Sequence, residues 1–523
     1  MKRTLVSYLV ITSIFASAPG TDFQVNTRTS NNQTDADIAM DANGNFVVVW
    51  TSYGQDGSSN GIFGRRFDSN CSPMCDEFQI NTTTSGNQKE PAVAMDSSGD
   101  FVVVWQGPQA IGDTNEDIFA QRFDANGQSL AGEFRVNTHT DSRQLSPAAA
   151  MDNDGKFIIV WECADDPAPG DRSIHGQLYD RFGSKIKNEL TISDQPSICR
   201  YPNVAMNDSN EVIVVWTGGS AYYYVYVRNF PADGNEPLLN SKKVDDEQFS
   251  TLTESSITID DMGNYVIAWD GRYTDSNDEN IYIKRFHWSH APLHIARFLV
   301  NTLQIGDQTD PSVAINDNSF IVVWEGDAES QNGQRDIFGQ RFVNQGEEIG
   351  PPIPLGDEFQ INLYEVNDQR YPDVAMRENG EFVSVWQSNG QGGSGYGIFG
   401  QAGPKVGSAD FTGDGFVNFY DYGILAQEWL KEGNPLRADL VDDNKIDGQD
   451  LAAFCEQWLT LCYQCDEVDI YSDGKIDFKD YCLLATNWKK CGPNLNGDFT
   501  GNGIVDLADL KALTFHWAKT CEQ

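Results

Sequence analysis

The stretch "PAVAMDSSGDFVVVW", Pro91 to Trp105, decides the fold because it returns along the chain. Close copies run from Pro147 to Trp161, from Pro202 to Trp216 and from Pro372 to Trp386. Self-similarity at a fixed period is the signature of a repeat architecture. With three looser copies the stretch occurs seven times, and the tryptophan at its end marks seven units, 53 to 62 residues apart: Trp50, Trp105, Trp161, Trp216, Trp269, Trp324 and Trp386.

Each unit holds four short runs of strand character separated by turn residues. In the second unit they are "PAVAM", "FVVVW", "IFAQRF" and "FRVNT", and the "DSSG" after the first run predicts a hairpin turn. Four strands in about 55 residues are typical of a β-propeller blade, whereas immunoglobulin-like domains need about a hundred residues and WD40 blades about forty. The sequence therefore predicts a mainly β protein with a seven-bladed propeller over residues 22–406.

The two ends of the array predict how the ring closes. The seventh unit stops after its third strand, at Gly397 to Val406, with no "FQVNT"-type strand behind it. Such a strand stands alone at Phe23 to Thr27, before the first complete unit. We expect this N-terminal strand to complete the seventh blade, because pairing there leaves no open sheet edge.

The repeated tryptophans have two interpretations, as sugar-stacking platforms or as core residues between blades. A residue at one fixed place in every repeat usually meets a need of the architecture, so we expect packing. The same reasoning makes core residues of the methionines that end five of the first strands, Met40, Met95, Met151, Met206 and Met376.

Catalytic motifs are weak in the propeller units. His287, His290 and His294 have a spacing that would suit a metal, but they fall in a loop without a helix to align them. The chain contains no H-E-x-x-H motif. Pairs of acidic residues for glycoside hydrolysis stay open, because pairing depends on the fold. We expect any binding in the variable loops after the tryptophans, such as Ser52 to Gly61 and Gly271 to Asn280.

Composition and the N-terminal pattern indicate which kinds of partner the protein binds and where in or outside the cell it acts. The 523 residues include 77 acidic and 36 basic ones, a net charge of −41, which argues against nucleic acids and anionic membranes and fits cations and neutral glycans. Residues 1–18 have the charged, apolar and small-residue order of a signal peptide, with cleavage expected after Ala18. No later segment has the eighteen apolar residues of a membrane span. We therefore expect a secreted or cell-surface protein.

The ten cysteines fit an oxidising destination and favour disulfides over zinc. The spacing leaves the pairing open. Six lie near the C-terminus and four in the propeller units: Cys455, Cys462, Cys465, Cys482, Cys491 and Cys521, and Cys71, Cys75, Cys163 and Cys199.

The last part of the chain carries four acidic loops of twelve residues, beginning "DFTGDGFVNFYD" at Asp410. Their first residues are 29 or 30 apart, and an apolar, helix-compatible segment ending in tryptophan follows each loop. Oxygen ligands at positions 1, 3, 5, 9 and 12, with a carbonyl at position 7, are what Ca²⁺ requires. The expected ligands are Asp410, Thr412, Asp414, Phe416 (carbonyl), Asn418 and Asp421; Asp439, Asp443, Asp447 and Asp450; Asp469, Asp473, Asp477 and Asp480; and Asp498, Thr500, Asn502, Asp506 and Asp509. The second loop has Val441 at position 3 and Asn444 at position 6, so we expect it to bind more weakly.

These loops resemble type I dockerin repeats, in two pairs over residues 409–460 and 466–521. The resemblance implies small α-helical, EF-hand-type calcium domains that fold with Ca²⁺ and dock onto a cohesin. Such domains often attach a polysaccharide-degrading enzyme or a carbohydrate-binding module to a scaffold. This chain departs from the family pattern in having four repeats and six cysteines, and in placing residues such as Phe419 and Tyr420 at the recognition positions.

The sequence favours a secreted, calcium-binding protein whose propeller is a non-catalytic recognition surface, attached to a cohesin-like or cell-envelope partner. The alternative is a polysaccharide-degrading hydrolase or lyase with its site in the propeller. A purely structural matrix component is the third interpretation. Carboxylates that converge with an arginine or histidine in the central mouth would favour the enzyme.

Overall fold

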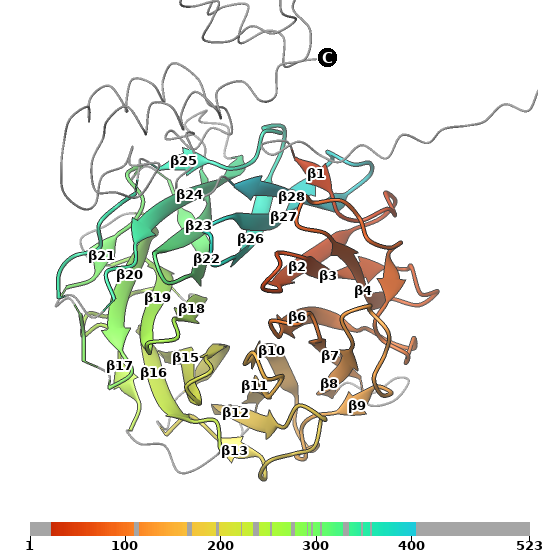
Figure 1. Ribbon diagram of the computed structural model, residues 1–523, viewed down its shortest axis with the longest axis horizontal. Helices are drawn as coiled ribbons and strands as arrows, with labels where there is room; N and C mark the ends of the chain where they lie inside the picture. The colour runs from red at the N-terminus through yellow and green to blue at the C-terminus, as the bar shows by residue number, and fades with distance from the viewer. Residues whose placement is uncertain are drawn as a thin grey trace, which may run out of the picture.

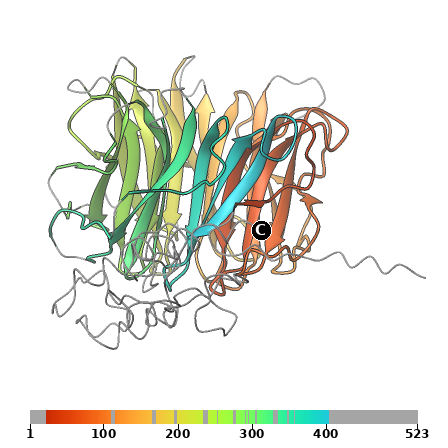
Figure 2. The same ribbon diagram turned by 90° about the horizontal axis from the view of Figure 1, so that it is seen from above.

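Seven antiparallel sheets of four strands each surround a central axis in the computed structural model (Figures 1 and 2). The structure describes residues 22–403, apart from short gaps at 109–114, 165–169, 195–197, 221, 234–239, 252–253, 274–277, 290, 294–295, 304–305, 328–333, 347–348 and 356–357. No helix long and apolar enough to cross a membrane occurs in this part of the chain. The predicted seven-bladed propeller is confirmed.

Within each blade the strands follow one another from the axis outward. Blade 1 has β2 (Gln33–Met40), β3 (Phe46–Tyr53), β4 (Asn60–Phe67) and β5 (Phe78–Gln79); blade 2 has β6 (Lys89–Met95), β7 (Phe101–Pro108), β8 (Glu116–Phe123) and β9 (Phe134–Arg135); blade 3 has β10 (Gln144–Met151), β11 (Phe157–Ala164), β12 (Arg172–Tyr179) and β13 (Leu190–Thr191); blade 4 has β14 (Cys199–Met206), β15 (Glu211–Gly219), β16 (Tyr223–Pro231) and β17 (Lys242–Lys243). Blade 5 has β18 (Ser255–Ile259), β19 (Asn264–Gly271), β20 (Asn280–His287) and β21 (Phe298–Leu299); blade 6 has β22 (Gln308–Ile315), β23 (Ser319–Asp327), β24 (Arg335–Val343) and β25 (Phe359–Gln360); blade 7 has β26 (Gln369–Met376), β27 (Phe382–Asn389), β28 (Tyr396–Gly403) and β1 (Phe23–Gln24).

In four blades an aspartate builds the turn between the first two strands, and an asparagine takes its place in two others. In blade 2 the Asp96 Oδ1 accepts hydrogen bonds from the backbone N–H groups of Ser98 at 2.9 Å and Asp100 at 3.0 Å. Gly99 has a φ of +92°, a conformation that costs glycine little. The turn predicted from "DSSG" is confirmed.

The ring closes as the ends of the array predicted. β1 pairs with β28, with Phe23 opposite Gly400, and so supplies the fourth strand of blade 7. Next to it the Asn26 Oδ1 accepts a hydrogen bond of 2.7 Å from the Ile398 N–H. The Asp22 carboxylate accepts N–H groups of Leu363 and Tyr364 in the neighbouring blade 6. The first residues of the propeller therefore join its last two blades.

The seven tryptophans are fully buried and pack in the apolar core between blades, so the packing interpretation is confirmed. Several donate their indole N–H to a buried glutamine of the inner strand, for example Trp161 to the Gln144 Oε1 at 2.8 Å. Of the five methionines, Met206 lies in the core and the other four pack against it.

Some predictions fall on residues that the structure does not describe. The signal peptide, the two dockerin-like pairs with all their calcium ligands, and the six C-terminal cysteines lie outside the described residues. In the propeller, Cys71 and Cys75 are both thiols, while Cys163 and Cys199 are buried in strands of neighbouring blades. The disulfides of the C-terminal part stay a prediction.

Candidate active site in the central channel

The inner strands of the seven blades line a central cavity of about 720 Å³. Its polar lining comes from the first residues of these strands. Gln33, which begins β2, pairs with Ser52 near the end of β3. The loops that follow the tryptophans therefore leave the sheets at the same end as this lining. This is the end where the sequence analysis placed binding, and ligand binding by those loops stays a prediction.

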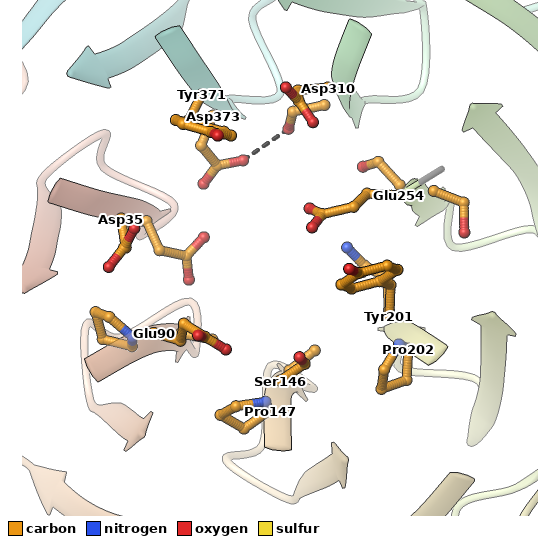
Figure 3. Close-up of a pocket in the computed structure, with 18 of the residues that line it drawn as sticks. Asp35, Glu90, Ser146, Pro147, Tyr201, Pro202, Glu254, Asp310, Tyr371 and Asp373 are labelled. Atoms are coloured by element: carbon orange, nitrogen blue, oxygen red, sulfur yellow. Dashed lines mark hydrogen bonds between the residues drawn. The ribbon is translucent and has the colours of Figure 1, made fainter. Parts of the chain in front are cut away.

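One position in each blade presents a side chain to the channel, and in six of the blades the backbone there is strained. In six blades a β-bulge at the start of the inner strand gives this residue a φ between +47° and +55°. In five of them the next residue is proline, which disfavours helical backbone angles further. We call these six residues and Glu254, which holds the same place in blade 5, the channel ring: Asp35, Glu90, Ser146, Tyr201, Glu254, Asp310 and Tyr371 (Figure 3).

Glycine would adopt this left-handed backbone freely, whereas an ordinary L-residue loses roughly 1–2 kcal/mol there. None of the seven positions is glycine, and two are tyrosine. Backbone strain of this kind concentrates at functional sites. The bulge belongs to the architecture of the blades, but the side chains held on it indicate that the channel itself has a use.

The four carboxyl groups of the channel ring do not share one environment. Burial, together with the nearby carboxyls of Glu90, Asp35 and Glu325, raises the pKa of Glu254 to about 7. Burial also raises the pKa values of Asp35 and Glu90, but there the charge of Lys89 opposes the shift. The Lys89 Nζ lies 3.2 Å from the Glu90 Oε1. Burial, with the carboxyls of Glu325 and Glu254, raises the pKa of Asp310 well above its usual range. Burial and neighbouring carboxyls thus favour the protonated forms of Glu254 and Asp310, whereas the nearby Lys89 favours the ionised form of Glu90.

A second pair of carboxyls lies where blades 7 and 1 meet. The Asp373 Oδ2 accepts the Ile38 N–H at 3.0 Å, and the Asp37 Oδ2 accepts the Val93 N–H at 2.5 Å, so each aspartate bonds to the next blade. Burial and the neighbouring Asp373 raise the pKa of Asp37 well above its usual range. The Asp373 Oδ1 also accepts the Ser312 hydroxyl at 2.6 Å (Figure 3). These aspartates link four neighbouring blades around the cavity, blades 6, 7, 1 and 2.

Arginines join the carboxyls at two places in the ring of blades. In blades 6 and 7 the fully buried Glu325, directly after Trp324, accepts the Arg335 Nη1 at 2.6 Å and the Arg370 Nη2 at 3.0 Å. It also accepts the backbone N–H of Tyr371 at 2.8 Å. These contacts fix Tyr371 at the edge of the channel, with 43% of its surface exposed.

The same residue types recur in blades 3 and 4. Glu162 follows Trp161, Arg172 begins the third strand, and Arg200 and Tyr201 begin the next inner strand. Arg172 forms an ion pair with Glu162, and the Arg200 side chain hydrogen-bonds to that of Tyr201. In the sequence the two sets appear as "RYPNVAM" from Arg200 and "RYPDVAM" from Arg370.

The channel ring was not predicted from the sequence, although the repeats contain a signal for it. The residue before the repeated proline changes from copy to copy, as Glu90, Ser146, Tyr201, Asp310 and Tyr371, while the proline itself is kept. When one position varies while the residues around it repeat, the fold of the blade does not require that particular side chain. Only the bulge shows that these side chains converge on one cavity.

The predicted histidine group is not testable as a set. His287 ends β20, with its Nδ1 3.2 Å from the Ser289 Oγ, whereas His290 and His294 lie outside the described residues. Within the described ranges of residues 22–403, no three histidines, cysteines or carboxylates gather in a metal-binding group.

No protein-family model matches the chain, and no curated protein matches it. Solved structures that are similar include an α-L-arabinofuranosidase from Fusarium graminearum, at 11% identity and a TM-score of 0.42, covering 62% of this chain and 98% of its own. A polysaccharide lyase of family 25, an ulvan lyase, has 12% identity and a TM-score of 0.39, covering 60% and 78%. The propeller domain of the trilobed protease from Pyrococcus furiosus has 10% identity and a TM-score of 0.42, covering 72% and 94%. These likenesses are too distant to carry an argument, so the fold rests on the strand pairing and the function on the channel.

Proposed function

We propose that the propeller is the catalytic domain of an extracellular polysaccharide-degrading hydrolase and that the channel ring is its active site. The observation that carries the proposal is the convergence on one cavity of arginines and of carboxyls in different charge environments, Glu254 beside other carboxyls and Glu90 beside Lys89. Titratable groups whose environments drive their pKa values apart are how proteins assign an acid and a base. This arrangement is the feature that distinguishes the enzyme from a passive recognition surface.

In the proposed reaction Glu254, protonated below about pH 7, donates its proton to the glycosidic oxygen as the bond to the anomeric carbon breaks. Glu90, whose ionised form is favoured by the nearby charge of Lys89, accepts a proton from the water that adds to that carbon. The two products carry the elements of water between them. Tyr201 and Tyr371 line the same cavity and offer ring faces and hydroxyls to the sugar.

The test is cleavage of a panel of polysaccharides by the full-length chain, followed as new reducing ends. We expect Glu254→Gln to lower kcat by roughly 10²- to 10⁴-fold while binding is retained, because general acid catalysis contributes about that much. Activity of the wild-type protein should fall as the pH rises through about 7, where Glu254 loses its proton. The exposed Asp141→Asn is the matched control and should change neither property. Full activity of Glu254→Gln would overturn the assignment, and binding without cleavage of any polysaccharide would favour the recognition surface.

The C-terminal repeats complete the proposal as an attachment device. We propose that Ca²⁺ fills the loops that begin at Asp410 and Asp498, and that the folded repeats hold the enzyme on a cohesin-like or cell-envelope partner near its substrate. The signal-peptide pattern at residues 1–18 supports export to that destination. The ligand spacing in each loop supports the metal.

A further inference from the structure

The polar lining of the channel is divided by charge. The carboxyls of Glu254, Asp310, Asp373 and Asp35 come from blades 5, 6, 7 and 1. Blades 3 and 4 contribute Arg143, Arg172 and Arg200, which we call the arginine sector, with Glu162 as the one carboxylate that their described residues add to the lining. Figure 3 shows Glu254 and Tyr201 projecting from neighbouring blades at the border between the two regions.

Carboxylates do not fully compensate the arginine sector. The Arg143 Nη2 lies 2.5 Å from the Glu116 Oε2, and Arg172 pairs with Glu162. Among the described residues no carboxylate forms an ion pair with Arg200, whose side chain hydrogen-bonds to Tyr201 instead. Arg200 and Arg143, after burial, lower the pKa of Arg172, so the three guanidinium groups are close enough to repel one another.

The matching set in blades 6 and 7 shows what a compensated arrangement looks like. There Glu325 accepts hydrogen bonds from both Arg335 and Arg370, and Arg370 does not line the cavity. Arg200 occupies the same position in the repeat as Arg370, but it lines the cavity. The corresponding carboxylate, Glu162, pairs with Arg172 instead. In blades 6 and 7 these residues therefore pair with one another, whereas in blades 3 and 4 they present the Arg200 guanidinium group to the cavity.

We infer that the arginine sector binds an anionic substituent of a polysaccharide, a carboxylate or a sulfate ester, and so selects an acidic glycan as the substrate. That the bound glycan is a substrate rests on the proposed function. That the arginine sector binds an anion rests only on the geometry of the channel. Guanidinium groups bind carboxylate and sulfate oxygens through paired N–H donors, which suits this chemistry. Tyr201 lies beside both Arg200 and Glu254, so an anionic group held at Arg200 would place its sugar next to the proposed acid.

The net charge of the chain does not contradict an acidic ligand. At physiological ionic strength the screening length is about 8 Å, so the local charges of the sector decide binding more than distant surface carboxylates do. Binding should nevertheless weaken as salt is raised, since the contact is ionic.

The test is isothermal titration calorimetry of the full-length chain carrying Glu254→Gln, so that nothing is cleaved during the titration. The probes are hexagalacturonate, a sulfated galactan hexasaccharide and the neutral cellohexaose. We expect an anionic probe to bind, and added Arg200→Gln to weaken it at least tenfold while Arg200→Lys restores most of the affinity. Binding of only one anionic probe would identify carboxylate or sulfate as the recognised group.

Two further variants keep the test decisive. Arg181→Gln removes the same charge from an exposed outer turn and should leave binding unchanged. Should Arg200→Gln not fold, the exposed Arg143→Gln should weaken the anionic probe in the same sense. Equal binding of cellohexaose and the anionic probes, or anionic binding unaffected by both arginine variants, would overturn the inference. Cleavage of neutral glycans alone would overturn it and leave the proposed hydrolase standing.

Discussion

Glu254→Gln should stabilise the propeller above neutral pH and leave its stability nearly unchanged in acid. Burial and the neighbouring carboxyls raise the pKa of Glu254 from 4.5 to about 7. In the unfolded chain this carboxyl releases its proton near pH 4.5, whereas in the native protein it keeps the proton up to about pH 7. Between these values only the native state holds the proton, so stability relative to the amide variant falls as the pH rises. Above pH 7 Glu254 is ionised in the native state as well, and the loss of stability relative to the amide variant is complete.

The magnitude follows from the two pKa values. At 1.36 kcal/mol per pKa unit, the difference between 4.5 and about 7 corresponds to about 3 kcal/mol. The Glu254 side chain is surrounded by protein yet exposed to the lumen of the channel, so water screens part of this penalty. We discount it by about half, to about 1–2 kcal/mol.

The assay is urea unfolding of wild type and variant at pH 4.5 and pH 8, followed by the fluorescence of the buried tryptophans. We expect the two proteins to unfold alike at pH 4.5, and the variant to be more stable by about 1–2 kcal/mol at pH 8. Asp141→Asn, which removes an exposed carboxyl, should give no such difference between the two pH values. Equal effects of Glu254→Gln at both pH values, or a loss of stability at pH 8, would refute the assignment of a protonated Glu254. The proposed acid would then have to be another carboxyl.

Two other predictions concern the ends of the chain. Deletion of Phe23 to Thr27 removes the strand that pairs with β28, so we expect the cooperative unfolding of the propeller to be lost; melting identical to wild type would contradict closure by this strand. Titration of the full-length chain with Ca²⁺ should release heat and raise the melting temperature, and Asp410→Ala with Asp498→Ala should remove most of that heat. Absence of any heat in the wild-type chain would remove the calcium sites.

The sequence predicted the blades because every unit repeats the same physical requirements. Apolar runs bury the second strand, an aspartate or asparagine makes the first turn in most units, and a tryptophan fills the space between sheets. Trp105 illustrates this, since it is fully buried at the place that the repeat marks. The role of the strand at Phe23 was predictable for the same reason. The seventh unit lacks its fourth strand, and one extra strand of that type stands before the first unit.

The channel ring was not predictable in the same way. Whether the residue before Pro91 faces solvent or the lumen depends on a bulge that shifts the pairing of β6 with β7 between Lys89 and Ala92. Apolar periodicity carries no information about that shift. Moreover, the pKa of Glu254 depends on Glu90 and Asp35, which lie in other blades and far away in the sequence. Such proximity exists only once the ring has closed.

Closure and the proposed chemistry therefore depend on the same contacts. Asp373 of blade 7 bonds to Ile38 of blade 1 and to Ser312 of blade 6, beside the cavity that holds the ring carboxyls. Asp35, on the same strand as Ile38, is among the groups that raise the pKa of Glu254. A displacement of blade 1 would move Asp35 away from Glu254 and remove part of what raises that pKa. We therefore expect variants that loosen the closing strand to lose the high pKa of Glu254 before the blades themselves unfold.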